Sequence, residues 1–108
     1  MKQINNYKFM SIFNFKDNES KKKFINFVFG ENGIKITRNY NGCLSINIYS
    51  SNKDTNKLVM IEEWNNMKSK KSYLEMRKKE GLYKYFETLL KNPVELELIT
   101  PIEFNSKL

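Results

Sequence analysis

The stretch Asn41-Gly-Cys-Leu-Ser-Ile-Asn-Ile-Tyr49 begins with a turn and continues as a segment of alternating apolar and polar residues. Asn41 and Gly42 indicate the turn, because both residue types tolerate a positive φ angle. The alternation that follows has the period of a β-strand with two different faces. A second strand-like segment, Leu58-Val-Met-Ile-Glu-Glu-Trp64, comes after a polar loop at 50–57. Together the two segments predict a hairpin on which the rest of the chain packs.

The other segments lie on both sides of this hairpin, and hydrophobic spacing and capping residues identify them. The expected elements are a strand over about 6–15, a helix from Asp17 or Asn18 to Gly30, a helix capped by Asn65, Asn66 or Ser69, a helix over 82–90 and a strand over 94–100. The Ile-x-Ile spacing in 34–40 fits either a helical turn or an extended segment, so the conformation of 31–40 stays open.

The predicted order is strand-helix-strand-strand-helix-strand, with one extra helix before the last strand. Right-handed crossovers on an antiparallel sheet then give an α+β, ferredoxin-like βαββαβ sandwich with helices on one face. At 108 residues we expect one domain over 1–108, with a core at about 6–102. The other sheet face carries large apolar side chains that no remaining segment covers. A homodimer through the sheet face is therefore expected.

Charge and hydropathy narrow the class of protein. The chain has 19 Lys and Arg against 12 Asp and Glu, a net charge of +7. Because Lys, Asn and Ile are frequent throughout, a solvated basic surface explains the charge better than an acidic partner does. The start of the chain has no apolar leader, and no apolar run approaches the roughly 18 residues of a membrane span. We expect a cytoplasmic protein that does not enter the membrane.

The sequence contains no histidine and a single cysteine, Cys43. This composition excludes Ser-His and Cys-His nucleophile systems, histidine-ligated haem and an internal disulfide, and it argues against most zinc sites. We therefore expect no metal site and no cofactor.

Four motifs follow one another in an order typical of one family: Asn41-Gly-Cys-Leu with Tyr49, Val59-Met-Ile-Glu-Glu-Trp64, Tyr73-x-x-x-Arg77-x-x-x-Gly81, and Pro93-Val-Glu-Leu. Over about 7–102 the chain resembles the antibiotic biosynthesis monooxygenase domain family of dimeric α+β barrels. The resemblance implies that two sheets join into a barrel with the helices outside. It also implies a small pocket in each protomer between the sheet and the helices.

Several members of this family oxidise quinols or polycyclic phenols with dioxygen and no cofactor. An electron-rich phenolate or enolate can itself reduce dioxygen, so the protein has only to bind, deprotonate and stabilise an anion. The resemblance thus implies a cofactor-independent monooxygenase-like protein acting on a small aromatic or quinol-type compound. A non-catalytic, ligand-binding or stress-associated dimer is the alternative. Tyr73 stands where such members commonly carry a histidine, and a tyrosine is a poor base at neutral pH.

Trp64, Tyr73 and Arg77 are the candidate catalytic residues. Trp64 would wall the pocket and donate from its indole, while Arg77 would pair with an anionic substrate. The structural alternative makes Trp64 an anchor between sheet and helix, with Arg77 paired to Glu62 or Glu80.

Asn14, Arg38, Tyr40 and Glu62 are the candidate substrate-binding residues. Neighbouring Glu62 and Glu63 face opposite sides of a strand, so only one can be a buried base. Arg38 and Tyr40 would line the pocket mouth and Asn14 would bind a substrate oxygen. Solvation of a loop and of a strand end are the structural alternatives.

An RNA-recognition module has the same element order, and lysines cluster at 21–23 and at Lys68, Lys70 and Lys71. That module requires a basic-Gly-aromatic-Gly-aromatic run on its third strand. The segment 58–64 has no such run, and the sequence therefore argues against nucleic acid.

Overall fold

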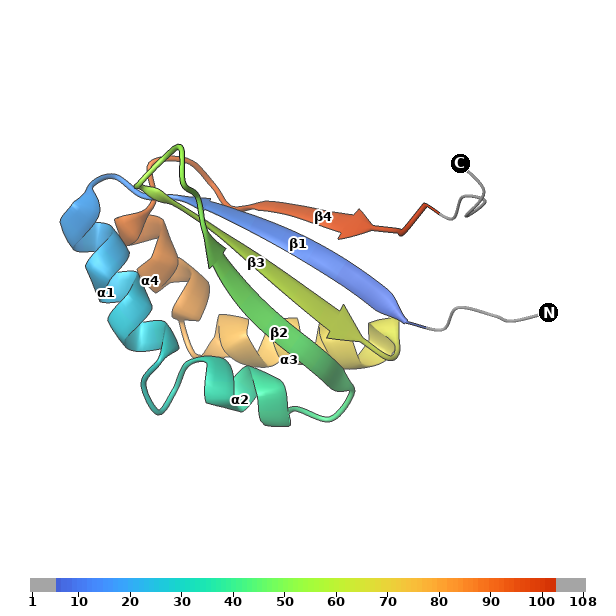
Figure 1. The fold of residues 1–108 in the computed structure, drawn as a ribbon. Helices are drawn as coiled ribbons and strands as arrows, with labels where there is room; N and C mark the ends of the chain where they lie inside the picture. The colour runs from blue at the N-terminus through green and yellow to red at the C-terminus, as the bar shows by residue number, and fades with distance from the viewer. Residues whose placement is uncertain (1–5, 103–108) are drawn as a thin grey trace, which may run out of the picture.

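A computed structural model describes residues 6–102 and arranges them as a curved sheet with helices on one face (Figure 1). In chain order the elements are β1 (Tyr7–Asn14), α1 (Asn18–Val28), α2 (Ile34–Asn39), β2 (Cys43–Ser50), β3 (Lys57–Trp64), α3 (Met67–Lys79), α4 (Leu82–Leu89) and β4 (Glu95–Ile99). The predicted ferredoxin-like α+β fold is confirmed. The segment whose conformation was open forms α2.

The sheet has the order β2-β3-β1-β4, and every neighbouring pair is antiparallel. Ser11 in the central strand β1 lies opposite Met60 of β3 and Leu96 of β4. Phe9 lies opposite Glu62. Because side chains two residues apart share a face, Phe9, Ser11 and Glu62 all point toward the helices.

One prediction about β2 is wrong. The alternation placed Leu44 with Ile46 and Ile48, but the register shifts between Cys43 and Ser45. A bulge of this kind sets two residues of one strand against one of its neighbour and re-aims the side chains. Leu44 is consequently 51% exposed, and Cys43 pairs with Trp64 on the helix side.

The helix starts follow from short side chains that accept hydrogen bonds from free backbone N–H groups. The Asp17 carboxylate accepts from the Ser20 N–H at 2.8 Å, and this bond lowers the pKa of Asp17. The Asn66 side chain accepts from the Ser69 N–H at 2.7 Å and begins α3. At the turn before β2, Gly42 alone takes a positive φ, of 101°.

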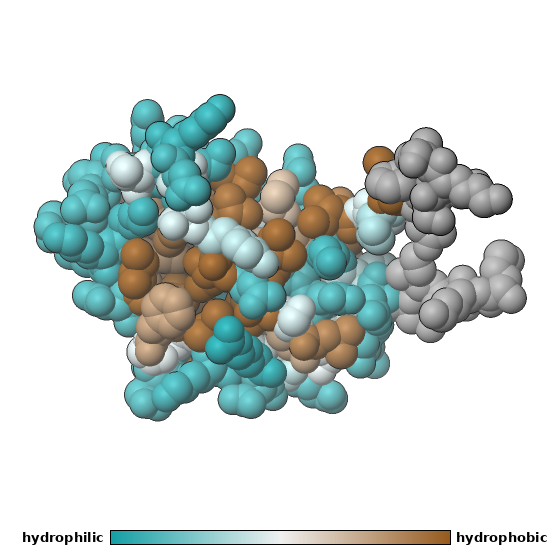
Figure 2. Space-filling view, viewed as in Figure 1, coloured by the Kyte–Doolittle hydropathy of each residue, from teal (hydrophilic) through white to brown (hydrophobic). Residues whose placement is uncertain are grey.

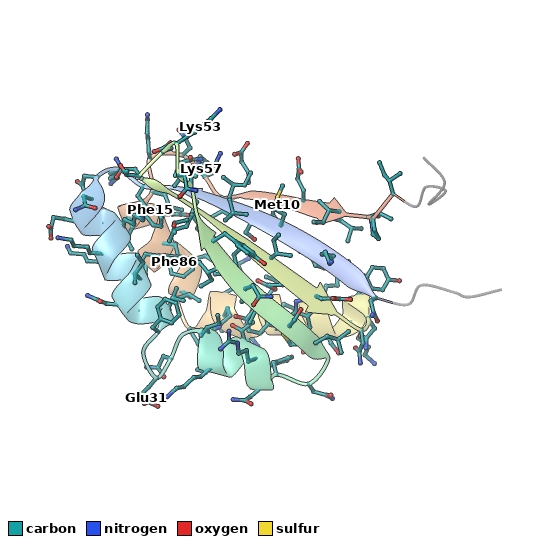
Figure 3. All side chains as sticks on the ribbon, in the orientation of Figure 1. Met10, Phe15, Glu31, Lys53, Lys57 and Phe86 are labelled. Atoms are coloured by element: carbon teal, nitrogen blue, oxygen red, sulfur yellow. The ribbon has the colours of Figure 1, made fainter. Side chains whose placement is uncertain are left out.

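The core divides into two clusters of buried side chains. The larger cluster packs Phe13 and Phe15 against Phe24 of α1 and Phe86 of α4. Figure 3 shows Phe15 and Phe86 at this end of the molecule. The smaller cluster packs Phe9 of β1 and Trp64 of β3 against Tyr73 of α3.

The outer face of the sheet, away from the helices, is less well covered. Its partly exposed apolar side chains are Met10 and Ile12 of β1, Val59 and Ile61 of β3, and Tyr49 of β2. Figure 2 shows hydrophobic residues in a band across the molecule, bordered by hydrophilic ones. Within residues 6–102, no helix combines the length and the apolar character needed to cross a membrane.

Candidate functional site

A cavity of about 390 Å³ lies between the sheet and helices α2, α3 and α4. This volume is in the range of pockets that hold small molecules. Apolar walls come from the sheet and from α1, α2 and α4, and they include Phe13, Phe27, Ile34, Ile46, Leu82 and Phe86. Buried polar side chains also line the cavity: Ser11, Thr37, Glu62, Lys70, Tyr73 and Arg77. The exposed side chains of Glu75 and Lys78 contribute to the lining as well. An apolar pocket with a few polar groups is typical of a small-molecule site.

Arg77 is 2% exposed, and its hydrogen bonds hold α3 against the segment that precedes α2. Its guanidinium donates to the Tyr73 hydroxyl at 2.9 Å, the Asn32 carbonyl at 2.9 Å, the Glu80 carboxylate at 3.1 Å, the Gly33 carbonyl at 2.8 Å and the Thr37 hydroxyl at 3.4 Å. An arginine has five N–H donors. Every donor of Arg77 is therefore in use within the protein.

Tyr73 occupies the centre of this network. Its hydroxyl lies 2.5 Å from the Thr37 hydroxyl and accepts a hydrogen bond from Arg77. Burial raises the pKa of Tyr73, although the hydrogen bonds with Thr37 and Arg77 act in the opposite direction. Tyr73 therefore stays protonated at neutral pH and can act as a hydrogen-bond donor but not as a base.

A second polar group joins β3 to α3. The Lys70 ammonium donates to Glu62 Oε1 at 2.7 Å, and the Trp64 indole donates to the same oxygen at 2.8 Å. The rings of Phe9, Trp64 and Tyr73 surround the Lys70 nitrogen, with centroids at 5.0, 5.5 and 5.7 Å. Lys70 is only 3% exposed. The cavity is thus bordered by a buried ion pair inside an aromatic cage.

The structure brings three of the candidate site residues, Glu62, Tyr73 and Arg77, to the cavity. Trp64 is fully buried and reaches the site through its bond to Glu62. Arg77 pairs with Glu80, as the structural alternative for this residue expected.

The other three candidates do not line the cavity. The Tyr40 ring packs against Trp64 and Tyr73, with centroids at 6.0 and 5.3 Å. Arg38 donates to the Ile46 carbonyl at 3.3 Å. Asn14 lies at the end of β1 and lines a separate depression of about 150 Å³.

Sequence reasoning missed Lys70, Thr37 and Ser11. It grouped Lys70 with the surface lysines, and the burial of Lys70 corrects that assignment. A signal was present, because Lys70, Tyr73 and Arg77 stand at positions i, i+3 and i+7 of one helix and therefore share a face. Thr37 and Ser11 carried no signal, since their roles depend on residues distant in the chain.

Metal ligation has little support in this part of the chain. Among residues 6–102, no group of three or more His, Cys, Asp or Glu side chains is placed to hold a metal ion. Burial, together with the charge of Glu62, raises the pKa of Cys43, which makes its thiol a weak nucleophile.

A family model described as antibiotic biosynthesis monooxygenase matches residues 17–78, more than half of the chain. Comparison with curated protein sequences gives no match.

Solved structures share the fold at low sequence identity. A conserved protein from Methanosarcina mazei Go1 superposes with a TM-score of 0.76 at 17% identity, over 87% of this chain and 90% of that one. The ActVA-Orf6 monooxygenase of Streptomyces coelicolor, solved with Nanaomycin D, gives 0.75 at 16% identity, over 93% and 90%. SnoaB, a cofactor-independent oxygenase from Streptomyces nogalater, gives 0.71 at 13% identity, over 95% and 99%.

Proposed function

The chain belongs to the antibiotic biosynthesis monooxygenase family, and from this premise we propose that it oxidises a small aromatic or quinol-type compound with dioxygen and without a cofactor. The observation that carries the proposal is the mainly apolar cavity of about 390 Å³, which buried polar groups also line. Ring-shaped substrates fit apolar walls, and their oxygens require the hydrogen-bonding groups found there.

In this reaction the substrate itself supplies the electrons. An ionised phenol or enol transfers electrons to dioxygen; one oxygen atom enters the product and the other leaves as water. The protein has to bind the ring, favour the anion and exclude bulk water, because a fixed polar environment stabilises charge better than a mobile one.

The hydrogen bonds suggest a role for each residue at the cavity. Tyr73 is the proposed donor to a substrate oxygen, and Arg77 is a positioning residue because it holds the Tyr73 hydroxyl. Trp64 orients Glu62 in the same way. Asn14, Arg38 and Tyr40 are not part of the proposed site, since none of them lines the cavity.

We also propose that two copies associate through their outer sheet faces. The support is the set of partly exposed apolar side chains on β1, β2 and β3, which the helices of the same chain do not reach. Burying such a face against its own copy removes it from water on both partners at once.

Oxygen consumption tests the proposed reaction. Purified protein is treated with a metal chelator and given a panel of quinols and polycyclic phenols, and uptake is followed with an oxygen electrode. We expect uptake by the wild type and a loss of about 100-fold in the Tyr73→Phe variant, the typical effect of removing one such donor.

Tyr85→Phe is the matched control, because Tyr85 is an exposed tyrosine of α4 that does not line the cavity. Equal uptake by both variants would exclude the proposed role of Tyr73. Tight binding of a phenol without any oxygen uptake would instead support the alternative, a non-catalytic ligand-binding protein.

A further inference from the structure

Lys70 has hydrogen-bonding capacity that the fold does not use. An ammonium group has three N–H donors. Within residues 6–102 its only hydrogen-bond acceptor is Glu62 Oε1, and its other neighbours are the faces of aromatic rings. Lys70 also lines the cavity. Two donors of this buried cation therefore have no hydrogen-bond acceptor among residues 6–102.

Two oxygen atoms beside Lys70 also have unused hydrogen-bonding capacity. Glu62 Oε1 accepts two hydrogen bonds, whereas no bond to Oε2 or to the Ser11 hydroxyl is formed within the described part of the chain. Ser11 faces Met60 across the β1–β3 ladder, which makes it a diagonal neighbour of Glu62 on the same face. Both residues line the cavity. The unused donors and acceptors are therefore gathered at one place.

Arg77, the residue that sequence reasoning assigned to an anionic substrate, does not have this capacity. All five of its donors are bound to protein groups, so an incoming anion would have to break an existing bond. The charged and titratable groups around Lys70 are Glu62 on β3, Tyr73 and Arg77 on α3, and Cys43 on β2. Of these groups and Lys70 itself, only Lys70 is a buried cation with free donors; Lys78, another lysine in the cavity lining, is exposed to solvent.

We infer that Lys70 is the anion-binding group of the cavity and that the ligand is bound there as a phenolate or enolate, with its ionised oxygen on the Lys70 ammonium. This inference rests on the proposed function and assigns the group that ionises the substrate. Binding a neutral phenol in this way breaks its O–H bond and releases one proton to the solvent. A charge-assisted hydrogen bond in a site of low dielectric constant favours the anion strongly.

Glu62 sets the strength of this site. Its carboxylate neutralises part of the Lys70 charge, and its free oxygen can accept a hydrogen bond from a second hydroxyl next to the ionised one. Removing the negative charge would leave Lys70 with an uncompensated positive charge, which an anionic ligand would then neutralise. The two members of the pair should therefore affect anion binding in opposite directions.

The test uses 4-nitrophenol, whose anion absorbs visible light, and its neutral methyl ether, 4-nitroanisole. Both are titrated into the protein at one pH at which free 4-nitrophenol is partly ionised. Wild-type protein should increase the absorbance of the 4-nitrophenol anion, because binding favours the ionised form. Lys70→Met should bind 4-nitrophenol at least about tenfold more weakly, the effect of losing one nearby opposite charge, and should bind 4-nitroanisole unchanged.

Glu62→Gln should bind 4-nitrophenol more tightly than wild type, again by about tenfold, because the carboxylate no longer competes for Lys70. A purely structural role of the pair predicts weaker binding in both single variants. Lys71→Met is the matched control, since it removes the same charge from an exposed neighbouring position and should change neither affinity.

The Lys70→Met/Glu62→Gln double variant guards against misfolding, because it leaves no unpaired charge buried. It should fold and should bind the two probes without preference for the anion. No increase in anion absorbance with wild type, equal affinity in wild type and Lys70→Met, or weaker binding in Glu62→Gln would each overturn the inference. Oxygen uptake with these negative results would leave the proposed function standing. Anion binding without oxygen uptake would support the inference about Lys70 and contradict the proposed oxidation reaction.

Discussion

At the scale of single residues, position 77 shows a charged side chain that serves the fold. Arg77 joins α3 to the backbone carbonyls of Asn32 and Gly33, which lie 45 and 44 positions away in the chain. Burial acts to lower the pKa of Arg77, but the hydrogen bonds with Tyr73 and Glu80 outweigh it and the pKa is raised. The guanidinium therefore remains charged and fully bonded, and it fixes the Tyr73 hydroxyl at the cavity.

Ionisation of Tyr73 should lower the free energy of unfolding as the pH becomes alkaline. Because burial raises the pKa of its phenol, the folded state keeps this proton when the unfolded state, with a pKa of about 10, has lost it. The contribution is complete below that pH and is lost as the pH rises toward the folded-state pKa. We expect Tyr73→Phe to lower the free energy of unfolding by about 1–2 kcal/mol at neutral pH, because hydrogen bonds are missing. Between neutral and alkaline pH, the free energy of unfolding should fall less in this variant than in wild type.

Urea unfolding at about pH 8 and about pH 11 measures this difference. Burial also raises the pKa of Tyr83, so Tyr83→Phe should flatten the alkaline profile as well. Exposed Tyr85 provides the control, and Tyr85→Phe should follow wild type at both pH values. An alkaline loss in Tyr73→Phe as large as that of wild type would contradict the prediction.

At the scale of elements, the turn between α1 and α2 positions α2, which forms part of the cavity wall. Gly33 lies directly against the end of α1: a Cβ atom placed on it would be 2.1 Å from the Val28 carbonyl oxygen and 2.4 Å from that of Phe27. Its own carbonyl accepts from Arg77. The absence of a side chain at this position lets α2 approach α1 and place Thr37 beside Tyr73.

Replacing Gly33 by alanine should therefore destabilise the fold. We expect Gly33→Ala to cost about 1–3 kcal/mol, the usual range for forcing extra atoms into a packed site, and to weaken ligand binding because Thr37 and Arg77 move. Gly81→Ala is the comparison. Gly81 has a φ of 80°, but apart from its chain neighbours no heavy atom of the described residues 6–102 lies within 4 Å of the position that a Cβ would take, so only the strain of a left-handed backbone is added. Chemical denaturation measures the free energy of unfolding of both variants. A smaller loss in Gly33→Ala than in Gly81→Ala would contradict the prediction.

At the scale of the whole molecule, the sheet has two differently filled faces. The helix face holds the core and the cavity, whereas the outer face leaves Met10, Ile12, Val59 and Ile61 only partly covered. Figure 2 shows hydrophobic residues at the surface on the side of the molecule seen in Figure 1. A face of this kind is typical of a surface that is buried in an assembly.

A charge at the centre of the outer face should separate the copies. We expect wild type to be a dimer by size-exclusion chromatography with light scattering, and Ile61→Glu to be a folded monomer, since a buried unpaired carboxylate is strongly unfavourable. Lys53→Glu, in the exposed loop between β2 and β3, should remain a dimer (Figure 3). A monomeric wild type, or a dimeric Ile61→Glu variant, would refute association through this face.

Much of this architecture follows from local pattern. Alternation predicted the strands, Asp17 and Asn66 were correctly named among the helix caps, and element order then led to the fold. The prediction was wrong at Leu44, because a bulge is a property of two paired strands and leaves little trace in one of them. The family motifs identified Tyr73, Arg77 and Glu62, three residues that line the cavity.

The amino-acid sequence by itself determined which segments are strands and helices, because periodicity and capping act between residues only a few positions apart. Tertiary structure alone decided which charges are free to act. Two of the backbone carbonyls that occupy the donors of Arg77 lie 44 and 45 residues away in the chain. The Lys70 ammonium is buried against the Glu62 carboxylate, which belongs to β3 and not to its own helix. Hydrogen-bond donors are used up by whatever the fold brings near them, and that outcome depends on contacts that no local pattern encodes.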